Sequence, residues 1–83
     1  MNAMKINMRL FGAFRQYGDS VEISVEEGSS VSAVKQALVG VLGAQVRDLI
    51  ADSVVANDDS ILPGDFVLDE GAKLFILPPV CGG

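Results

Sequence analysis

Two stretches in which apolar and polar residues alternate strictly, followed by a stretch with helical spacing, constrain the fold of this chain most. Apolar side chains occupy every second position over residues 4–10, and again over residues 21–25. A period of two is typical of a β-strand with one buried face. Because only a short segment that contains Gly12 and Gly18 separates the two stretches, they are predicted to pair as a hairpin.

A helix is predicted over residues 30–42. Ser30 is a good N-cap, because its side-chain oxygen can accept a hydrogen bond from a free backbone N–H of the first turn. Gly43 is a good helix stop. The apolar residues at helical spacing, which are predicted to face the core, are Val31, Val34, Leu38, Val41 and Leu42. The polar residues predicted to point away from the core are Ser32, Lys35 and Gln36.

The remaining elements are predicted to be short. They are a helical turn near residues 46–50, strands at 53–56, 61–62 and 73–77, and a turn at 57–60. The segment 66–68 is left unassigned. This order of elements predicts an α+β fold, in which one main helix covers one face of a mixed sheet. If the last strand returns beside the first, those two strands are parallel neighbours in the centre of the sheet.

The predicted core joins the helix to the strands. The helix is expected to pack Val34, Leu38 and Val41 against Ile6, Met8, Ile23 and Ile76. A chain of 83 residues is expected to form one domain.

Composition narrows the function classes. Six Lys and Arg residues stand against eleven Asp and Glu residues, which gives a formal net charge of −5. This charge argues against a nucleic-acid partner, since binding to phosphates needs a basic surface. The chain has no histidine, which removes the commonest general base and a common metal ligand, so no metal site is expected. An enzyme acting alone is therefore not the favoured class.

Two further features concern the compartment. The single cysteine, Cys81, cannot form an internal disulfide, so nothing indicates an oxidising compartment. Residues 1–10 carry Lys5 and Arg9 and have no long apolar core, so they resemble neither a signal peptide nor a membrane span. A cytoplasmic location without a membrane partner is the expectation.

The last six residues are Pro78-Pro79-Val80-Cys81-Gly82-Gly83. The two prolines restrict the backbone and favour an extended chain, so they act as a stiff spacer. Gly82 and Gly83 have no Cβ and can pass through a slot too narrow for a side chain. The segment is predicted to be a semi-rigid arm whose final carboxylate is itself the candidate reactive group.

The chain resembles the ubiquitin-like sulfur-carrier family (the MoaD/ThiS group), and within it most closely the small subunit of molybdopterin synthase. The thiamine sulfur carrier is a more distant relative. The resemblance covers nearly the whole chain, and the tail is its most specific part. The motifs that carry it are Leu10-Phe11-Gly12-Ala13-Phe14-Arg15, Ser30-Val31, Val55-Ala56-Asn57 and the tail from Pro78 to Gly83.

The resemblance implies a ubiquitin-like β-grasp domain over residues 1–77 and a reactive tail over residues 78–83. Two positions depart from the family pattern. The usual Gly-Asp-Glu run before the last strand is Gly71-Ala72-Lys73 here, which can alter partner choice. Cys81 stands where the family more often has another small residue; it is interpreted as a small tail residue in preference to a sulfur relay.

The resemblance also implies the chemistry of the tail. An α-carboxylate is ionised at neutral pH and is a poor electrophile, so Gly83 needs activation. An adenylyltransferase partner similar to ubiquitin-activating enzymes would use ATP to adenylate Gly83, and sulfur would then displace AMP to leave a thiocarboxylate. The chain itself would bind no cofactor. The loaded tail, with Pro78, Pro79, Val80, Cys81 and Gly82, would enter the large catalytic subunit of molybdopterin synthase and deliver sulfur to a cyclic pterin precursor.

Four residues are predicted to contact a partner: Phe11, Leu77, Arg15 and Ile61. Leu77 and Phe11 are expected to lie on the sheet face away from the helix, where exposed apolar side chains are typical of a binding surface. Arg15 matches an arginine of the family and can pair with a partner's carboxylate. Phe75 remains open between packing and contact.

Two alternatives stay open. One keeps the carrier chemistry and changes the pathway to thiamine, cysteine or tRNA thiolation, or to protein conjugation. The other is a non-reactive β-grasp interaction module, whose tail only docks.

Overall fold

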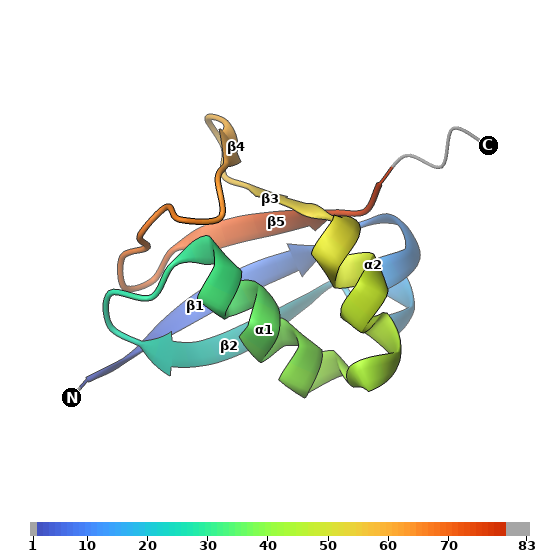
Figure 1. The fold of residues 1–83 in the computed structure, drawn as a ribbon, viewed down its shortest axis with the longest axis horizontal. Coiled ribbons are helices and arrows are strands. Elements are labelled where there is room, and N and C mark those ends of the chain that lie inside the picture. Colours follow the sequence, from blue (N-terminus) through green and yellow to red (C-terminus); the bar gives the residue numbers. More distant parts are fainter. Residues whose placement is uncertain (1, 80–83) are drawn as a thin grey trace.

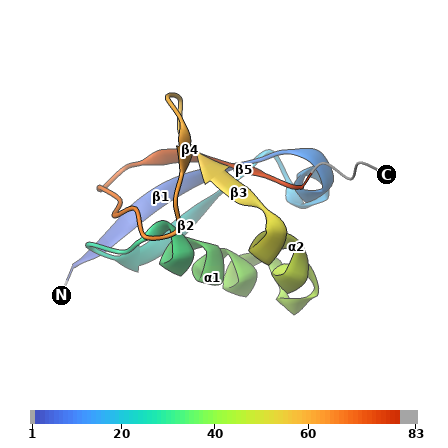
Figure 2. The same cartoon turned by 45° about the horizontal axis from the view of Figure 1, so that its top comes forward.

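The computed structural model describes residues 2–79, and Met1 and Val80–Gly83 lie outside the described part. The described residues form a five-stranded mixed sheet in the order β2-β1-β5-β3-β4. Figures 1 and 2 show both α-helices on one side of this sheet. The strands are β1 Ala3–Leu10, β2 Ser20–Glu26, β3 Val54–Ala56, β4 Ile61–Leu62 and β5 Lys73–Leu77; the helices are α1 Val31–Leu42 and α2 Arg47–Asp52, with 3-10 turns η1 Gly12–Tyr17 and η2 Ala44–Val46. The predicted α+β class, with a ubiquitin-like mixed sheet under one main helix, is confirmed.

The hairpin predicted from the two alternating stretches is present. Strands β1 and β2 pair antiparallel, with Ile6 opposite Ile23. Their connection is the 3-10 helix η1, which is more regular than the predicted turn and places Phe14 fully inside the core. The even-numbered side chains of β1 point to the core and the odd-numbered ones to the opposite face, as the period of two predicts.

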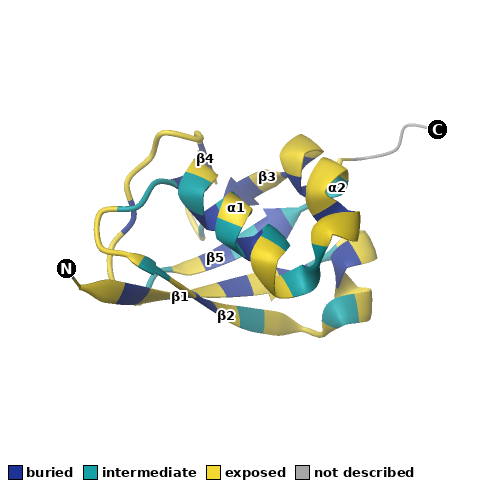
Figure 3. Ribbon diagram, turned by 60° about the horizontal axis from the view of Figure 1, so that its bottom comes forward, coloured by how far each residue is buried: buried dark blue, intermediate teal, exposed yellow. Residues whose placement is uncertain are grey.

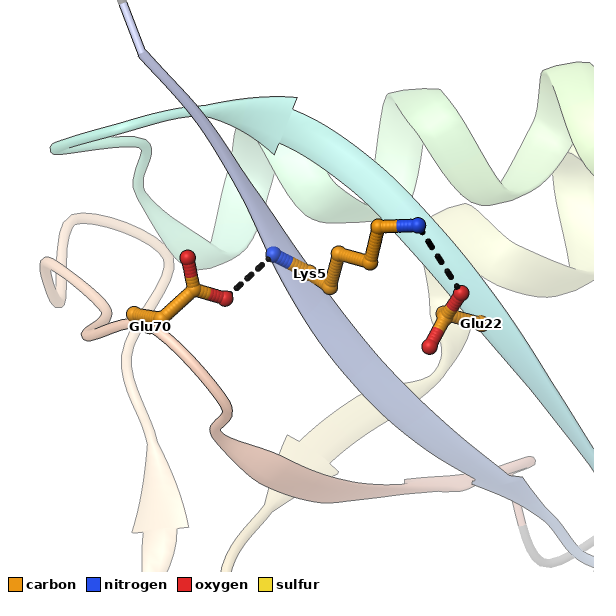
Figure 4. A network of polar contacts seen from close by, with 3 residues as sticks. All are labelled: Lys5, Glu22 and Glu70. Atoms are coloured by element: carbon orange, nitrogen blue, oxygen red, sulfur yellow. Dashed lines mark hydrogen bonds and ion pairs between the residues drawn. The ribbon is translucent and has the colours of Figure 1, made fainter.

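Strand β5 lies in the middle of the sheet, parallel to β1 and antiparallel to β3. Met8 pairs with Leu74 and Leu10 with Ile76, which confirms the predicted central parallel pair. The turn before β5 is tied to β1: the Lys5 N–H donates to Glu70 Oε2 at 2.8 Å (Figure 4), and the Gly71 N–H donates to the Lys5 carbonyl at 2.9 Å. These bonds fix the start of β5 beside β1.

Helix α1 begins and ends where the sequence predicts. Ser30 is the N-cap, with its Oγ accepting a hydrogen bond from the Ala33 N–H at 3.3 Å, and Gly43 ends the helix. Val31, Val34 and Leu38 are buried, as predicted. These buried side chains belong to the core between the helix and the inner face of the sheet.

The predicted burial of Val41 is wrong, because this side chain is 52% exposed. The cause is the segment that follows the helix: η2 and α2 pack against α1, and they cover its flank rather than extend its sheet-facing stripe. On that flank Val39, which was not predicted to face the core, and Leu42, which was, are partly buried against the core. The last turn of α1 is thus shared between the sheet and α2.

Lys35, which was predicted to point away from the core, is not a free surface residue. Lys35 is half-buried, and its Nζ donates to the Ser53 carbonyl at 2.9 Å and to the Ala51 carbonyl at 3.4 Å. The last carbonyl groups of a helix have no partner within the helix, and a lysine is a favourable donor to them. Lys35 therefore fastens α1 to the end of α2.

The short elements follow the predicted order. The predicted helical turn near residues 46–50 is present as η2 and α2, with Val46 and Ile50 buried. In the turn between β3 and β4, Asn57 Oδ1 accepts hydrogen bonds from the N–H groups of Asp59 and Ser60, both at 2.9 Å. The segment that the sequence left unassigned pairs with the start of α1 through a bridge between Val67 and Ser30.

One hydrophobic core joins the sheet to both helices, and Figure 3 shows the buried positions on the strands and on the facing sides of the helices. The predicted core positions of the strands are Ile6, Met8, Ile23 and Ile76, and all of them are at most 1% exposed. No helix formed by residues 2–79 is long and apolar enough to cross a membrane.

Replacing Ser30 by Ala should lower the free energy of unfolding by about 1 kcal/mol, because one N–H of the first turn of α1 loses its acceptor. Chemical denaturation measures the change. The control is Ser32→Ala, two positions further along the same turn, which is exposed and should leave stability within about 0.5 kcal/mol of the wild type. Equal losses in both variants would contradict the capping role.

Candidate functional site

The predicted reactive tail leaves the sheet from its centre. Strand β5 ends at Leu77 and is hydrogen-bonded to β1 on one side and to β3 on the other. Pro78 is half-buried and Pro79 is exposed. The predicted tail residues Val80, Cys81, Gly82 and Gly83, with the candidate reactive carboxylate, lie outside the described residues. The tail therefore starts at the end of a central strand that β1 and β3 hold from both sides.

Three of the four predicted partner-contact residues come together on the outer face of the sheet. Leu77 pairs with Val54, and Ala56 pairs with both Phe75 and Ile61, so these side chains share the face opposite the helices. Phe11 joins them through an edge-to-face contact with Phe75, with ring centroids 5.7 Å apart. We call this surface the outer-face patch and define it by Phe11, Val54, Ile61, Phe75 and Leu77.

The side chains of the outer-face patch are exposed or half-buried. Ile61 is 62% exposed and Val54 is 41% exposed, while Phe11, Phe75 and Leu77 are half-buried. A contiguous apolar surface on a small domain is typical of a binding site. That Phe11, Leu77 and Ile61 contact a partner stays a prediction.

Two members of the patch were not among the predicted contact residues. Phe75 alternates with Leu77 in the last strand and so had a sequence signal, but period alone does not distinguish packing from contact. Val54 had no such signal, because β3 has only three residues and alternation cannot assign a face over so short a stretch.

Arg15 is placed differently from the other three. It lies on η1, where its Nη2 pairs with Asp19 Oδ1 at 3.1 Å, and it is not part of the outer-face patch. Both side chains are mostly exposed, and such pairs contribute little to stability. Arg15 can exchange Asp19 for another carboxylate at small cost, so its predicted role in a partner ion pair stays a prediction.

A shallow hollow of about 690 Å³ adjoins the patch on the same face of the sheet. Its charged lining residues are Lys5, Arg9, Asp19, Glu22, Asp58 and Lys73. Lys5 is engaged with Glu22, at 3.4 Å between Nζ and Oε1 (Figure 4), and the Arg9 guanidinium lies 6.0 Å from the centre of the Phe11 ring. Within residues 2–79, no group of three or more His, Cys, Asp or Glu side chains is arranged to hold a metal ion.

The two departures from the family pattern have different surroundings. Ala72 is partly buried against the core, and its carbonyl accepts a hydrogen bond from the Asn7 N–H at 2.9 Å. Lys73 is exposed and lines the hollow beside Phe75. Of the two, Lys73 is therefore the one whose side chain is exposed on the surface.

Comparison with solved structures shows the fold. The chain is similar to SAMP1 from Haloferax volcanii, at 20% identity over 95% of this chain and 99% of that one, with a TM-score of 0.80. It is similar to a putative molybdopterin converting factor subunit 1 from Pyrococcus furiosus, at 24% identity over 93% and 99%, with a TM-score of 0.77. It is also similar to a ubiquitin from Caldiarchaeum subterraneum, at 18% identity over 99% and 100%, with a TM-score of 0.67.

No curated protein matches this chain significantly in sequence. The family model, however, matches most of it: the model of the ThiS family covers residues 8–83, from the second half of β1 through the tail. The chain therefore belongs to the ThiS family of ubiquitin-like sulfur carriers.

Proposed function

We propose that this chain carries sulfur as a thiocarboxylate on Gly83 and is the small, sulfur-donating subunit of molybdopterin synthase. The observation that carries the proposal is the ThiS-family match, which runs through the tail to Gly83. The similarity to a structure described as a molybdopterin converting factor subunit supports the choice of pathway. The position of Pro78 and Pro79, directly after the central strand β5, supports the role of the tail as a stiff arm.

The proposed chemistry takes place on one carbonyl carbon. The Gly83 carboxylate attacks the α-phosphorus of ATP in the active site of an adenylyltransferase partner, and pyrophosphate leaves. A sulfide equivalent then attacks the carbonyl carbon, forming the C–S bond as the C–O bond to AMP breaks. Transfer of the sulfur to a pterin precursor and hydrolysis return the carboxylate. The chain binds no cofactor of its own in this scheme, and the partners supply the acid, base and cation groups.

The outer-face patch is the proposed docking surface for both partners, the adenylyltransferase and the large catalytic subunit. It lies on the face from which β5 presents Leu77, immediately before the tail. A partner that covers the patch therefore holds the domain beside the place where the tail starts. The division into a domain over residues 1–77 and a tail over 78–83 belongs to the same proposal.

Replacing Leu77 by Ala should weaken binding of the large subunit by more than about 1 kcal/mol, because a central apolar anchor of an interface is lost. Isothermal titration calorimetry measures the change. Val41→Ala is a matched control, since Val41 is an exposed apolar residue of α1, on the other side of the sheet, and should leave affinity unchanged. Wild-type affinity of a folded Leu77→Ala variant would place the docking surface elsewhere.

A second candidate keeps the carrier chemistry in another pathway, or uses Gly83 to modify proteins. The similarity to SAMP1, which a second solved structure describes as a small archaeal modifier protein, favours keeping this candidate. A non-reactive interaction module is the third. Incubation with ATP, the cognate activating enzyme and a sulfur source, followed by addition of the pterin precursor and the large subunit, separates them. The proposal predicts that molybdopterin forms. A thiocarboxylate without molybdopterin would favour another pathway, and the absence of both products would favour the interaction module.

A further inference from the structure

Gly12 lies against the first residue of the tail. A Cβ placed on Gly12 would meet the Pro78 ring at 2.6 Å from Cγ and 3.4 Å from Cδ. Real Cβ atoms are essentially never found that close to another carbon, so the ring occupies the space that a side chain at position 12 would need. The residue after β5 and the residue two after β1 are therefore in close contact.

The backbone around Gly12 is held firmly. The Leu10 N–H donates to the Asp19 carbonyl at 2.9 Å, and the Phe14 N–H donates to the Phe11 carbonyl at 3.1 Å. The Phe14 side chain is fully buried in the core. Pro78 thus rests on a segment that cannot shift without disturbing the core.

The contact is specific to this glycine. Gly12 has φ +57°, and Gly28 has φ +85°, a backbone conformation that favours glycine in both cases. A Cβ on Gly28 would meet nothing within 4 Å, whereas one on Gly12 would meet Pro78. At position 28 the positive φ is the only feature that favours glycine. At position 12 the Pro78 ring is a second one, because it leaves no room for a side chain.

We propose that Gly12 is a positioning residue for sulfur transfer. The Pro78 ring packs against Gly12, which has no side chain, and this contact sets the direction in which the chain leaves β5. Pro78 has a fixed φ, and Pro79 restricts the residue before it, so little freedom remains to correct an error in that direction. Three residues, Val80, Cys81 and Gly82, separate Pro79 from Gly83, and an extended chain advances by at most ~3.3–3.6 Å per residue. A small change in the contact between Gly12 and Pro78 therefore becomes a larger displacement of the reactive group. This consequence rests on the proposed function.

The direction of the tail can be measured without any partner. Cys81 is the single cysteine of the chain, so a nitroxide spin label attached there reports the position of the tail through broadening of backbone amide NMR signals. Gly12→Ala should change which amides of the domain are broadened. Gly28→Ala should leave the pattern as in the wild type, although its backbone is strained in the same sense.

A double variant tests the contact itself. Pro78→Ala removes Cγ, the atom nearest to the added methyl group, so Gly12→Ala should change the broadening less in a Pro78→Ala background than in the wild type. The same pattern in wild type and Gly12→Ala would overturn the proposal. An equal change in both backgrounds would overturn it too, since the effect would then not pass through the Pro78 ring.

The catalytic consequence is read in the sulfur-transfer assay. Gly12→Ala should lower kcat at least about tenfold with KM for the partner nearly unchanged, since misplacement by ~1 Å can lower a rate on the order of 100-fold. Gly28→Ala should keep the wild-type kcat. A wild-type kcat for Gly12→Ala would contradict the role in transfer. If the wild type itself acquires no sulfur, the proposed function fails, whereas the spin-label measurement still decides whether Gly12 directs the tail.

Discussion

Deleting Gly83, or adding one alanine after it, should abolish sulfur delivery and leave the fold and the melting temperature nearly unchanged. The reacting carbon is the last carbonyl of the tail in the proposed mechanism. An added residue moves that carbon by about 3.3–3.6 Å and puts a methyl group beside it. A displacement of ~1 Å can already lower a rate on the order of 100-fold, so both changes should remove activity in practice.

Thermal melting and a thiocarboxylate assay on the same samples check this prediction. Replacing Asp59 by Ala is a suitable control, because Asp59 is exposed in the turn between β3 and β4 and lies outside the outer-face patch. It should keep the wild-type rate. Sulfur delivery at the wild-type rate by either tail variant would show that the carboxylate of Gly83 is not the carrier group, and the docking-only module would then be the better interpretation.

Replacing Leu38 by Ala should lower the free energy of unfolding by roughly 2–5 kcal/mol. Leu38 is fully buried in the middle of α1, where it belongs to the core that joins this helix to the sheet. The substitution removes apolar contacts and leaves a cavity that its neighbours fill only in part. A small domain has a stability of only about 5–15 kcal/mol, so this one change should be visible in any unfolding experiment.

Urea denaturation of Leu38→Ala, with Val41→Ala as the matched control, tests the structural explanation of the helix. Both changes remove methyl groups from α1, but Val41 is 52% exposed and should lose less than about 0.5 kcal/mol. A loss for Val41→Ala as large as that for Leu38→Ala would mean that the stripe predicted from the sequence is correct and that the placement of α1 against α2 is wrong.

The fold was predictable from sequence to the extent that buried faces leave a period. Alternation over residues 4–10 and 21–25 gave β1 and β2, and Ser30 and Gly43 gave the ends of α1. The position of Val41 was not predictable in this way, because its exposure depends on which element covers the last turn of the helix. Periodicity reports that a face is buried but not which neighbour buries it.

Side-chain contacts between segments far apart in the chain also could not be predicted from the sequence. Lys35 has the spacing of a solvent-facing residue, and only the end of α2 gives it acceptors. Gly12 has the sequence signal of a turn, and its contact with Pro78 depends on β1 and β5 being parallel neighbours. For the candidate site, Phe11, Leu77 and Ile61 were predicted and lie on one face, whereas Val54 joined them only through its pairing with Leu77.

The most direct test of the sulfur-carrier account is the intact mass of this chain after incubation with ATP, its cognate activating enzyme and a sulfur source. The account predicts a mass increase equal to the replacement of one oxygen by one sulfur, located in the C-terminal peptide at Gly83, and absent when ATP is omitted. Fragmentation of that peptide distinguishes Gly83 from Cys81, the other position at which sulfur can be added. An unchanged mass with an active enzyme, or added sulfur on Cys81 alone, would contradict the account.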